Sequence, residues 1–307
     1  MKIYHYTSIE TLELILKNRT IRFNRSDKVD DPDEIELEVN GLPFAKYLLV
    51  SCWSIEEEES IPQWSIYAGK SKGVRITLDS EHIFQDFIDS TRVSSSEKDI
   101  TEKVWNKRSS QSNGIDIFPS PFRSNDNKIS YIPHYIYHGT LNPTSSGLAI
   151  MPPSPKTNFL IPVEYVDSLE NAYSEHIQIK YSEDGKFSMI FTPIIGYKKN
   201  KSWEFQKEAR FVLMLMHTVP QPHNRLILDI PHFSFTKYGF PPLKNGKKEE
   251  LTYYDISIDR DAFEYMEVIA GPETSQGDKN KIIELLTKYA PKAKYSESKC
   301  RTRFCKE

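Results

Sequence analysis

Apolar and polar positions at the start of the chain predict a strand, a helix and a second strand. Residues 3–6 are typical of a short strand, and Thr7 followed by Glu10 matches the capping box that begins many helices. Four apolar side chains then recur at helical spacing: Ile9, Leu12, Ile15 and Leu16. Residues 21–24 alternate between apolar and polar side chains, so we expect a half-buried strand to follow this helix.

A second strand, helix and strand are predicted further along. Residues 47–54 have the apolar, β-rich content of a buried strand, residues 63–68 predict a short helix, and residues 73–78 predict another strand. Between the two units, residues 25–38 hold seven acidic side chains around a proline. A solvated loop or a short helix is the expected structure there.

Residues 91–160 differ from the rest of the chain. Ser, Asn, Pro and Gly dominate, and apolar side chains gather only at 129–139 and 147–151. A loop of this length is uncommon inside a compact core, so we predict an insertion or lid with local structure of its own or with mobility. We treat residues 1–307 as one elaborated domain.

The remainder of the chain returns to regular patterns. Strands are predicted at 161–165, 209–216, 226–230, 255–258 and 267–271, and an amphipathic helix at 279–289. Strands and helices mix without strict alternation, so the sequence indicates an α+β fold.

Charge and cysteine content exclude several classes of protein. The formal net charge is −3, with 40 basic and 43 acidic residues, so no global field attracts nucleic acid or an anionic membrane. The 3 cysteines do not form a disulfide framework or a zinc motif. The sequence also contains no apolar run of membrane-spanning length and no signal peptide, which predicts a cytoplasmic protein.

Two groups of candidate functional residues lie at the ends of predicted strands or on the helix that follows. In the first, strand alternation places His5 and Thr7 on one face and Tyr6 on the other. A histidine near a strand end is more often structural than functional. The second group combines Ser51 with a Trp64–Tyr67 pair at helical i, i+3 spacing. Such aromatic pairs usually belong to a core, and the functional alternative is a wall that stacks on a flat ring.

The third candidate group precedes the strand at 209–216. Glu208 and Arg210 share a face of this strand, and a surface ion pair of little energetic value is the plainer interpretation. The alternative is a carboxylate at the strand mouth that faces a substrate. The acidic side chains of residues 30–36 could form a cation site or a solvated surface. The solvated surface is the preferred interpretation, because their spacing does not match an EF-hand.

Known catalytic motifs are scarce. The sequence contains no Gly-rich phosphate loop, HExxH, GxSxG or CxxC motif, which argues against P-loop, Rossmann, zinc-protease and serine-hydrolase chemistry. Scattered carboxylates give a metal-dependent nuclease little support. No metal site is predicted.

Six segments, in this order, resemble the bacterial domain of unknown function number 2971. They are IYHYTSIETLELILKNRTIRF, DDPDE, VSCWS, QWSIYAGKSKGVRITL, WEFQKEARFVL and VIAGPETS. Together they span most of the chain outside the insertion. This resemblance implies no established activity.

Three of the same patches more distantly resemble ADP-ribosyltransferases of the His-Tyr-Glu type. The resemblance implies a split, mixed sheet that binds NAD as substrate, with His5 on the adenosine ribose, Tyr67 stacked on the nicotinamide ring and Glu208 as the catalytic carboxylate. Such a carboxylate would stabilise the oxocarbenium-like transition state of glycosidic cleavage. Thr7 would help to position the nicotinamide, and Trp64 would add to the stacking surface.

Two features bear on this resemblance. Tyr6 stands where many of these enzymes have glycine, which leaves room for a fold that does not catalyse. His138-Gly139-Thr140 matches the His-Gly-Thr opening of poly-ADP-ribose polymerases more literally, but too few residues follow for the helix expected between the strands. We interpret that match as coincidence.

The function expected from these resemblances is ADP-ribosyl transfer by a toxin or antiphage defence effector that modifies nucleic acid or protein. The alternative is a non-catalytic module that recognises a nucleotide or a nucleic-acid end. Its aromatic pocket would act with Arg22, Arg75 and Arg210. In the ADP-ribosyltransferase resemblance, Ser51 and Ser54 resemble the Ser-x-x-Ser variants of a structural serine motif, and Ser51 is expected to contribute to NAD binding.

Overall fold

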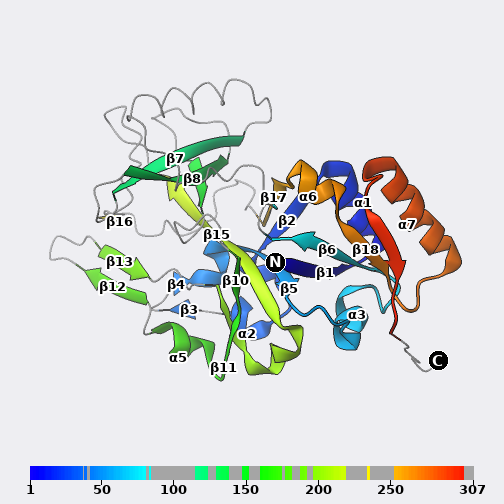
Figure 1. Ribbon diagram of the computed structural model, residues 1–307. Helices are drawn as coiled ribbons and strands as arrows, with labels where there is room; N and C mark the ends of the chain where they lie inside the picture. Colours follow the sequence, from blue (N-terminus) through cyan, green and yellow to red (C-terminus); the bar gives the residue numbers. More distant parts are fainter. Residues whose placement is uncertain are drawn as a thin grey trace.

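The chain forms an α+β fold around a mixed, largely antiparallel sheet (Figure 1). The computed structural model describes residues 1–36, 38–39, 42–80, 83, 115–123, 129–137, 147–151, 160–174, 177–181, 187–191, 196–218, 234–235 and 252–300. Within these residues the main sheet has twelve strands, nine of which follow the order β19-β18-β6-β1-β5-β15-β9-β8-β7. In this order all neighbours are antiparallel except β18 and β19, which are parallel.

The bounds of the strands in the main sheet are β1 Lys2–Thr7, β2 Thr20–Arg25, β5 Leu48–Ser54, β6 Val74–Asp79, β7 Ile115–Arg123, β8 Ile129–Tyr137, β9 Gly147–Met151, β10 Leu160–Pro162, β15 Glu208–Thr218, β17 Tyr253–Ser257, β18 Glu267–Ala270 and β19 Lys294–Glu297. Smaller sheets contain β3 Glu38–Val39 with β4 Leu42–Pro43, β11 Glu164–Val166 with β14 Lys198–Asn200, and β12 Ile177–Tyr181 with β13 Phe187–Phe191 and β16 Ser234–Phe235.

The described helices are α1 Ile9–Asn18, α2 Pro32–Ile35, α3 Ile61–Tyr67, α5 Leu169–Ser174, α6 Arg260–Glu264 and α7 Gln276–Tyr289, with 3-10 turns η1 Ser26–Lys28, η2 Phe44–Tyr47 and η4 Lys201–Gln206. None of them combines the length and the apolar character that a bilayer-spanning helix requires.

Helices pack against both faces of the central strands (Figure 1). The apolar stripes of α1, α6 and α7 form one core with alternate side chains of β1, β5 and β15, including Ile3, Trp53 and Phe211. On the opposite face, Trp64 and Ala68 at α3 pack against Tyr6. Burying each large apolar side chain contributes about 1.5–3 kcal/mol, so this two-sided packing stabilises the centre of the sheet.

β5 lies at the centre and has two different strands along one edge. Its other edge pairs continuously with β15, from Leu48 to Ser54. On the first edge, β2 pairs only near the start of β5, at Val50 and Leu49, whereas β1 meets its end through Tyr4 and Ser54. Beyond that pair the β1 and β5 backbones part, and the side chain of His5 lies between them.

Most elements predicted from the pattern are confirmed, with shifted ends. Ser8, and not Thr7, caps α1, because its hydroxyl accepts a hydrogen bond from the Thr11 amide at 3.2 Å. The single strand predicted at 161–165 is two strands, β10 and β11, in different sheets. The strand predicted at 226–230 lies outside the described residues.

The described parts of residues 91–160 join the main sheet. Both apolar islands form strands, β8 and β9, and β9 pairs with β15 through register pairs such as Met151 with Met214. This segment therefore extends the sheet, at least in the strands that the structure describes. The His138-Gly139-Thr140 match lies outside them.

Candidate functional site

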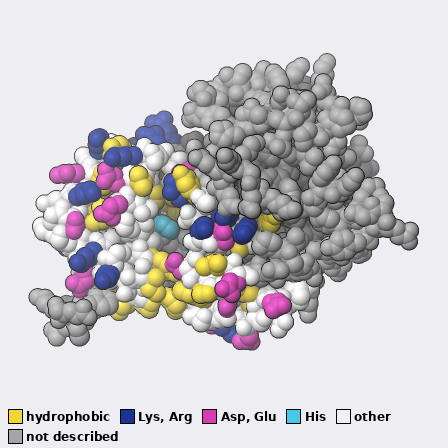
Figure 2. Space-filling view, turned by 180° about the vertical axis from the view of Figure 1, so that it is seen from behind, with side chains coloured by type: hydrophobic (Ala, Val, Ile, Leu, Met, Phe, Trp, Pro, Cys, Tyr) yellow, Lys and Arg dark blue, Asp and Glu magenta, His cyan; other side chains and the backbone are white. Residues whose placement is uncertain are grey.

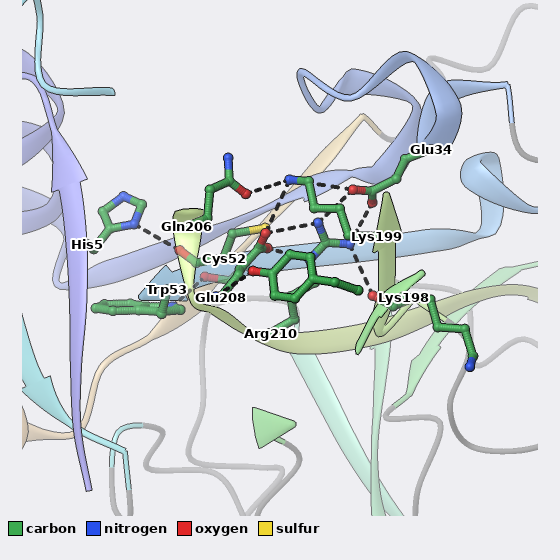
Figure 3. A network of polar contacts seen from close by, with 12 residues as sticks. His5, Glu34, Cys52, Trp53, Lys198, Lys199, Gln206, Glu208 and Arg210 are labelled. Atoms are coloured by element: carbon green, nitrogen blue, oxygen red, sulfur yellow. Dashed lines mark hydrogen bonds and ion pairs between the residues drawn. The ribbon is translucent and has the colours of Figure 1, made fainter. Parts of the chain in front are cut away.

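Four buried charged side chains, Glu34, Lys199, Glu208 and Arg210, form what we call the charge network (Figure 3). Glu208 opposes Ser54 in the register of β15 and β5, and Arg210 opposes Cys52. Cross-strand partners share a face of the sheet, so these side chains point away from the core that contains Trp53.

Arg210 is the centre of the charge network. Its guanidinium donates to both carboxylate oxygens of Glu34, at 2.6 and 2.7 Å, and to the Glu208 carboxylate from Nε and Nη2. It also donates to the Gly196 carbonyl at 3.1 Å. The side chain is 0% exposed, so this bidentate geometry satisfies a charge that burial alone would strongly disfavour.

Lys199 supplies the second cation. Its ammonium lies 3.2 Å from Glu208 and 3.6 Å from Glu34, and it donates to the Gln206 side-chain oxygen at 2.8 Å. Two carboxylates therefore face two cations, and the charge network is electrically neutral.

The Glu208 carboxyl stays ionised. Burial by itself would raise its pKa, but the charges of Arg210 and Lys199 outweigh burial and hold this pKa at about 2. The Cys52 thiol also hydrogen-bonds to Glu208, and burial raises the pKa of this thiol. The site thus contains a carboxylate that is ionised at neutral pH and a thiol that is not.

His5 lies at the gap between β1 and β5. Its Nδ1 is 3.1 Å from the Cys52 carbonyl, and its ring centroid lies 5.1 Å from that of Trp53. A carbonyl only accepts, so Nδ1 carries the proton and the lone pair lies on Nε2. Desolvation lowers the pKa of this half-buried imidazole, which is consequently neutral at pH 7.

Tyr67 reaches the charge network through one side chain. Its hydroxyl accepts from the Gln206 amide nitrogen, and the oxygen of the same amide accepts from Lys199. Desolvation raises the pKa of Tyr67, with a further contribution from nearby carboxylates that include Glu208. The structure thus brings Tyr67 and Glu208 to one region, linked by Gln206 and Lys199.

Two further candidate residues have core or structural roles. Trp64 is 0% exposed and donates to Glu59 at 3.0 Å, so it is a core residue and not a stacking surface. Ser51 is buried on the opposite face, where its hydroxyl accepts from the Trp53 indole at 3.0 Å.

The β1 residues beside His5 are buried. Tyr6 contacts Trp64 edge-on, and its hydroxyl accepts from the Ser60 amide at 3.0 Å. Thr7 is only 6% exposed at the end of the strand. Both side chains are therefore packed inside the described structure and offer little surface to a ligand.

Arg22 does not join the other candidates. It lies on β2 and forms a two-point ion pair with Asp255 of β17, at 2.8 and 2.9 Å. Its guanidinium also lies over the Tyr253 ring, 3.6 Å from the centroid. Arg22 therefore fastens β17 to β2, and the nucleotide-contacting role predicted for it is not supported by its position.

Sequence reasoning missed Glu34, Lys199 and Gln206. Glu34 belongs to an acidic segment that we expected to be solvated, yet it is 4% exposed. The one signal for it was the Asp-Pro of the family resemblance, since Pro32 begins α2 and thereby sets the direction of this helix. Gln206 lies within the WEFQKEARFVL segment of the same resemblance, but nothing in that segment singles it out, and Lys199 carried no signal.

The described side chains do not form a group of three or more His, Cys, Asp or Glu suited to a metal ion. The arrangement offers instead a neutral imidazole whose Nε2 has no hydrogen-bond partner among the described residues, a phenol, and an ionised carboxylate held by two cations. Comparison with family models, curated proteins and solved structures gave no match, so both family resemblances stay predictions.

Proposed function

We infer that this protein binds NAD at the gap between β1 and β5 and cleaves its nicotinamide glycosidic bond as an ADP-ribosyltransferase-like enzyme. The supporting observation is the arrangement of His5, Tyr67 and Glu208. They come from β1, α3 and the start of β15 and lie around the end of β5. His5 contacts the Cys52 carbonyl from the side of the sheet that contains Trp53, and the Cys52 thiol hydrogen-bonds to Glu208 on the other side. Gln206 and Lys199 link Glu208 to Tyr67. This convergence is what the resemblance implies for residues so far apart in the sequence.

Each of the three residues has a defined task in this proposal. The free Nε2 of His5 accepts a hydrogen bond from a ribose hydroxyl, and Tyr67 packs against the nicotinamide ring. Glu208 stabilises the positive charge that develops on the ribose as the bond from its anomeric carbon to the nicotinamide nitrogen breaks. The ADP-ribosyl group then passes to water or to a nucleophile of the acceptor.

The ion pairs of Glu208 set a condition on this chemistry. Glu208 is 5% exposed, and its carboxylate is held by Arg210 and Lys199. A ribose hydroxyl must therefore displace one of these two donors before it can bond to the carboxylate. Lys199 is the donor that can move, because it has a flexible stem and holds Glu208 by one contact, at 3.2 Å, whereas Arg210 holds it by two. Arg210 is fixed by five acceptor oxygens on Glu34, Glu208 and Gly196.

The same ion pairs favour a second candidate, a non-catalytic module that recognises a nucleotide. A carboxylate whose charge is already neutralised contributes little to an oxocarbenium-like transition state. Figure 2 shows Lys and Arg side chains interspersed with Asp and Glu over the described part of one face. This mixed surface fits a small nucleotide better than a long nucleic acid, which needs a continuous basic track.

Incubation of the full-length protein with NAD distinguishes the two candidates. The assay measures nicotinamide release by chromatography and NAD affinity by calorimetry. The enzyme proposal predicts release that Glu208→Gln lowers by about a hundredfold or more, the size of a lost electrostatic contact in a transition state. Glu204→Gln, a nearby exposed carboxylate paired with Lys207, is the matched control and should leave release unchanged.

Because Glu208→Gln unbalances a buried network, Tyr67→Leu provides a second test that removes the stacking ring. It should weaken NAD affinity, whereas Tyr67→Phe keeps the ring and should bind NAD nearly as tightly as the wild type. Binding of NAD without nicotinamide release would support the recognition module instead. If the protein neither binds nor cleaves NAD, the enzyme proposal is wrong, and so is a module that recognises NAD.

A further inference from the structure

A pocket of about 420 Å³ lies beside the charge network, among α2, α3 and η4. Its walls include the acidic side chains Asp31 and Asp33 and the apolar side chains Ile66, Trp203 and Phe205. Ile66 and Phe205 are exposed, at 50% and 37%, so the pocket presents apolar surface to solvent. The combination of carboxylates and aromatic rings is typical of sites that hold a cationic group on an apolar stem.

Asp31, one of the wall residues of this pocket, carries an unused acceptor. The residue is 1% exposed, and its Oδ1 caps α2 by accepting from the Asp33 amide at 3.0 Å. Its Oδ2 is buried and has no hydrogen-bond partner among the described residues. A buried carboxylate oxygen without a donor is costly, and a ligand that brings an N–H would remove this cost.

The second carboxylate of the pocket is already engaged. Asp33 accepts from the Asn200 amide nitrogen at 2.9 Å, which connects α2 to the start of η4. Asp33 keeps a second carboxylate oxygen on an exposed side chain, where water can satisfy it. Asp31 Oδ2 is the buried oxygen that lacks a donor among the described residues, so a ligand N–H has most to gain there. The adjacent charge network is neutral overall, so these two carboxylates set the sign of the local field.

Contacts within the protein order the aromatic wall of the pocket, which consists of Trp203 and Phe205. The rings of Trp203 and Phe205 lie 6.0 Å apart at 35°, and the Lys199 ammonium lies 4.9 Å from the Trp203 centroid. Glu208 and Glu34 balance the charge of this lysine, so it orders the indole without making the pocket positive. A pre-ordered aromatic surface lowers the entropy lost when a flexible ligand binds.

We propose that this pocket binds an organic cation that carries N–H groups on an apolar stem, a primary ammonium or a guanidinium. The cationic head donates to Asp31 Oδ2, and the stem packs against Ile66 and Phe205. Because Oδ2 needs a donor, a quaternary ammonium of similar size does not satisfy the site. This inference does not depend on NAD chemistry, since none of its wall residues is assigned to the NAD site.

Calorimetric titration of the full-length protein tests the proposal with agmatine and n-butylamine as probes and tetramethylammonium as the comparison cation. Saturable binding of either N–H cation, at least about tenfold tighter than tetramethylammonium, is expected for one charge-assisted hydrogen bond. Equal affinity for all three cations would overturn the proposal, and so would the absence of saturable binding.

Variants locate the site. Asp31→Asn keeps an oxygen to cap α2 but replaces the other acceptor with a donor, and it should weaken agmatine binding by about tenfold or more. Asp259→Asn, which alters the N-cap of α6 on a different surface, is the matched control and should bind agmatine normally. Phe205→Ala tests the stem contact on an exposed residue with little risk to folding, and it should also weaken binding. Unchanged affinity in both pocket variants would contradict the inference.

A last titration separates two sources of the same chemistry. A short blocked peptide with one central arginine is compared with free agmatine. Similar affinities indicate a site for basic side chains of a protein partner. Binding of agmatine alone indicates a site for a small amine. Both results support an N–H cation, whereas failure of both probes would exclude it.

Discussion

At the residue scale, the main difference between prediction and structure concerns Glu34 and Glu208. The sequence placed Glu208 correctly beside Arg210 on one face of a strand, because alternation within a strand is local information. It could not show that Glu34 and Lys199 complete the pairing, because these contacts depend on how α2 and β14 pack against β15. An ion pair interpreted as a surface feature is thus part of a buried network.

This burial predicts a large effect for Glu34→Gln. Removing one carboxylate leaves Arg210 and Lys199 with an uncompensated positive charge, so we expect a loss of about 3–5 kcal/mol in the free energy of unfolding. Glu204→Gln breaks an exposed pair with Lys207 and should cost no more than about 0.5 kcal/mol. Urea titration of the two variants measures both values.

A double replacement separates charge burial from packing. If Glu34→Leu and Arg210→Met are combined, the pair is lost without leaving that particular charge unpaired, and the loss should be smaller than the sum of the two single losses. Simple additivity would mean that the two residues act independently, against the two-point contact between them.

At the element scale, hydrophobic periodicity and turn chemistry predicted most of the order of strands and helices. Periodicity located α1, α7 and the central strands because each buries one stripe or face. The same reasoning could not divide residues 161–165 into β10 and β11. These strands pair with partners distant in sequence, β15 and β14, and their short apolar runs give no sign of the change of sheet.

One glycine shows how closely the central elements approach. A Cβ on Gly73 would lie 2.1 Å from the Thr7 carbonyl oxygen and 3.0 Å from that of Ala68. Both neighbours are backbone atoms, so β1 or the turn after α3 would have to shift its backbone to make room for a Cβ, at a substantial cost in free energy. Gly73 therefore permits β6 to begin directly beside the end of β1.

Gly73→Ala should consequently destabilise the protein by at least about 2 kcal/mol, as a forced backbone displacement in a packed region. Gly277→Ala is the matched control, because a Cβ there meets only a side-chain oxygen at 3.8 Å within the first turn of α7. It should leave stability unchanged or raise it by up to about 1 kcal/mol. Thermal unfolding of both variants gives the comparison, and equal losses would contradict the steric argument.

At the scale of the whole molecule, the gap at β5 could be predicted only as a resemblance. Its residues come from β1, β5, α3 and β15, and no local pattern states which distant strands become neighbours. The buried positions of Trp64 and Ser51 could not be predicted for the same reason, because the face that each side chain uses depends on what covers the sheet. Burial and pairing in three dimensions decide between a site residue and a core residue.

The free energy of unfolding depends on pH through every group whose pKa differs between the folded and unfolded states, and His5 and Glu208 are two such groups. The pKa of His5 is lowered from 6.5 in the folded state, so the unfolded chain binds the proton first and stability should fall as the pH drops below about 6.5. The pKa of Glu208 is lowered from 4.5 to about 2, so its contribution is present above pH 4.5 and is lost as the pH falls towards 2. Two successive losses are expected on acidification.

His5→Gln isolates the first loss. Glutamine does not titrate, so the difference in unfolding free energy between wild type and variant should be constant above pH 6.5 and should shift in favour of the variant below it, by up to about 1.4 kcal/mol per pH unit. All other groups titrate in both proteins and cancel in the difference. Urea unfolding at a series of pH values from 7.5 to about 5 measures this difference. A difference that stays flat through this range would mean that His5 is as readily protonated in the folded protein as in the unfolded chain, which is incompatible with a desolvated imidazole beside the Cys52 carbonyl.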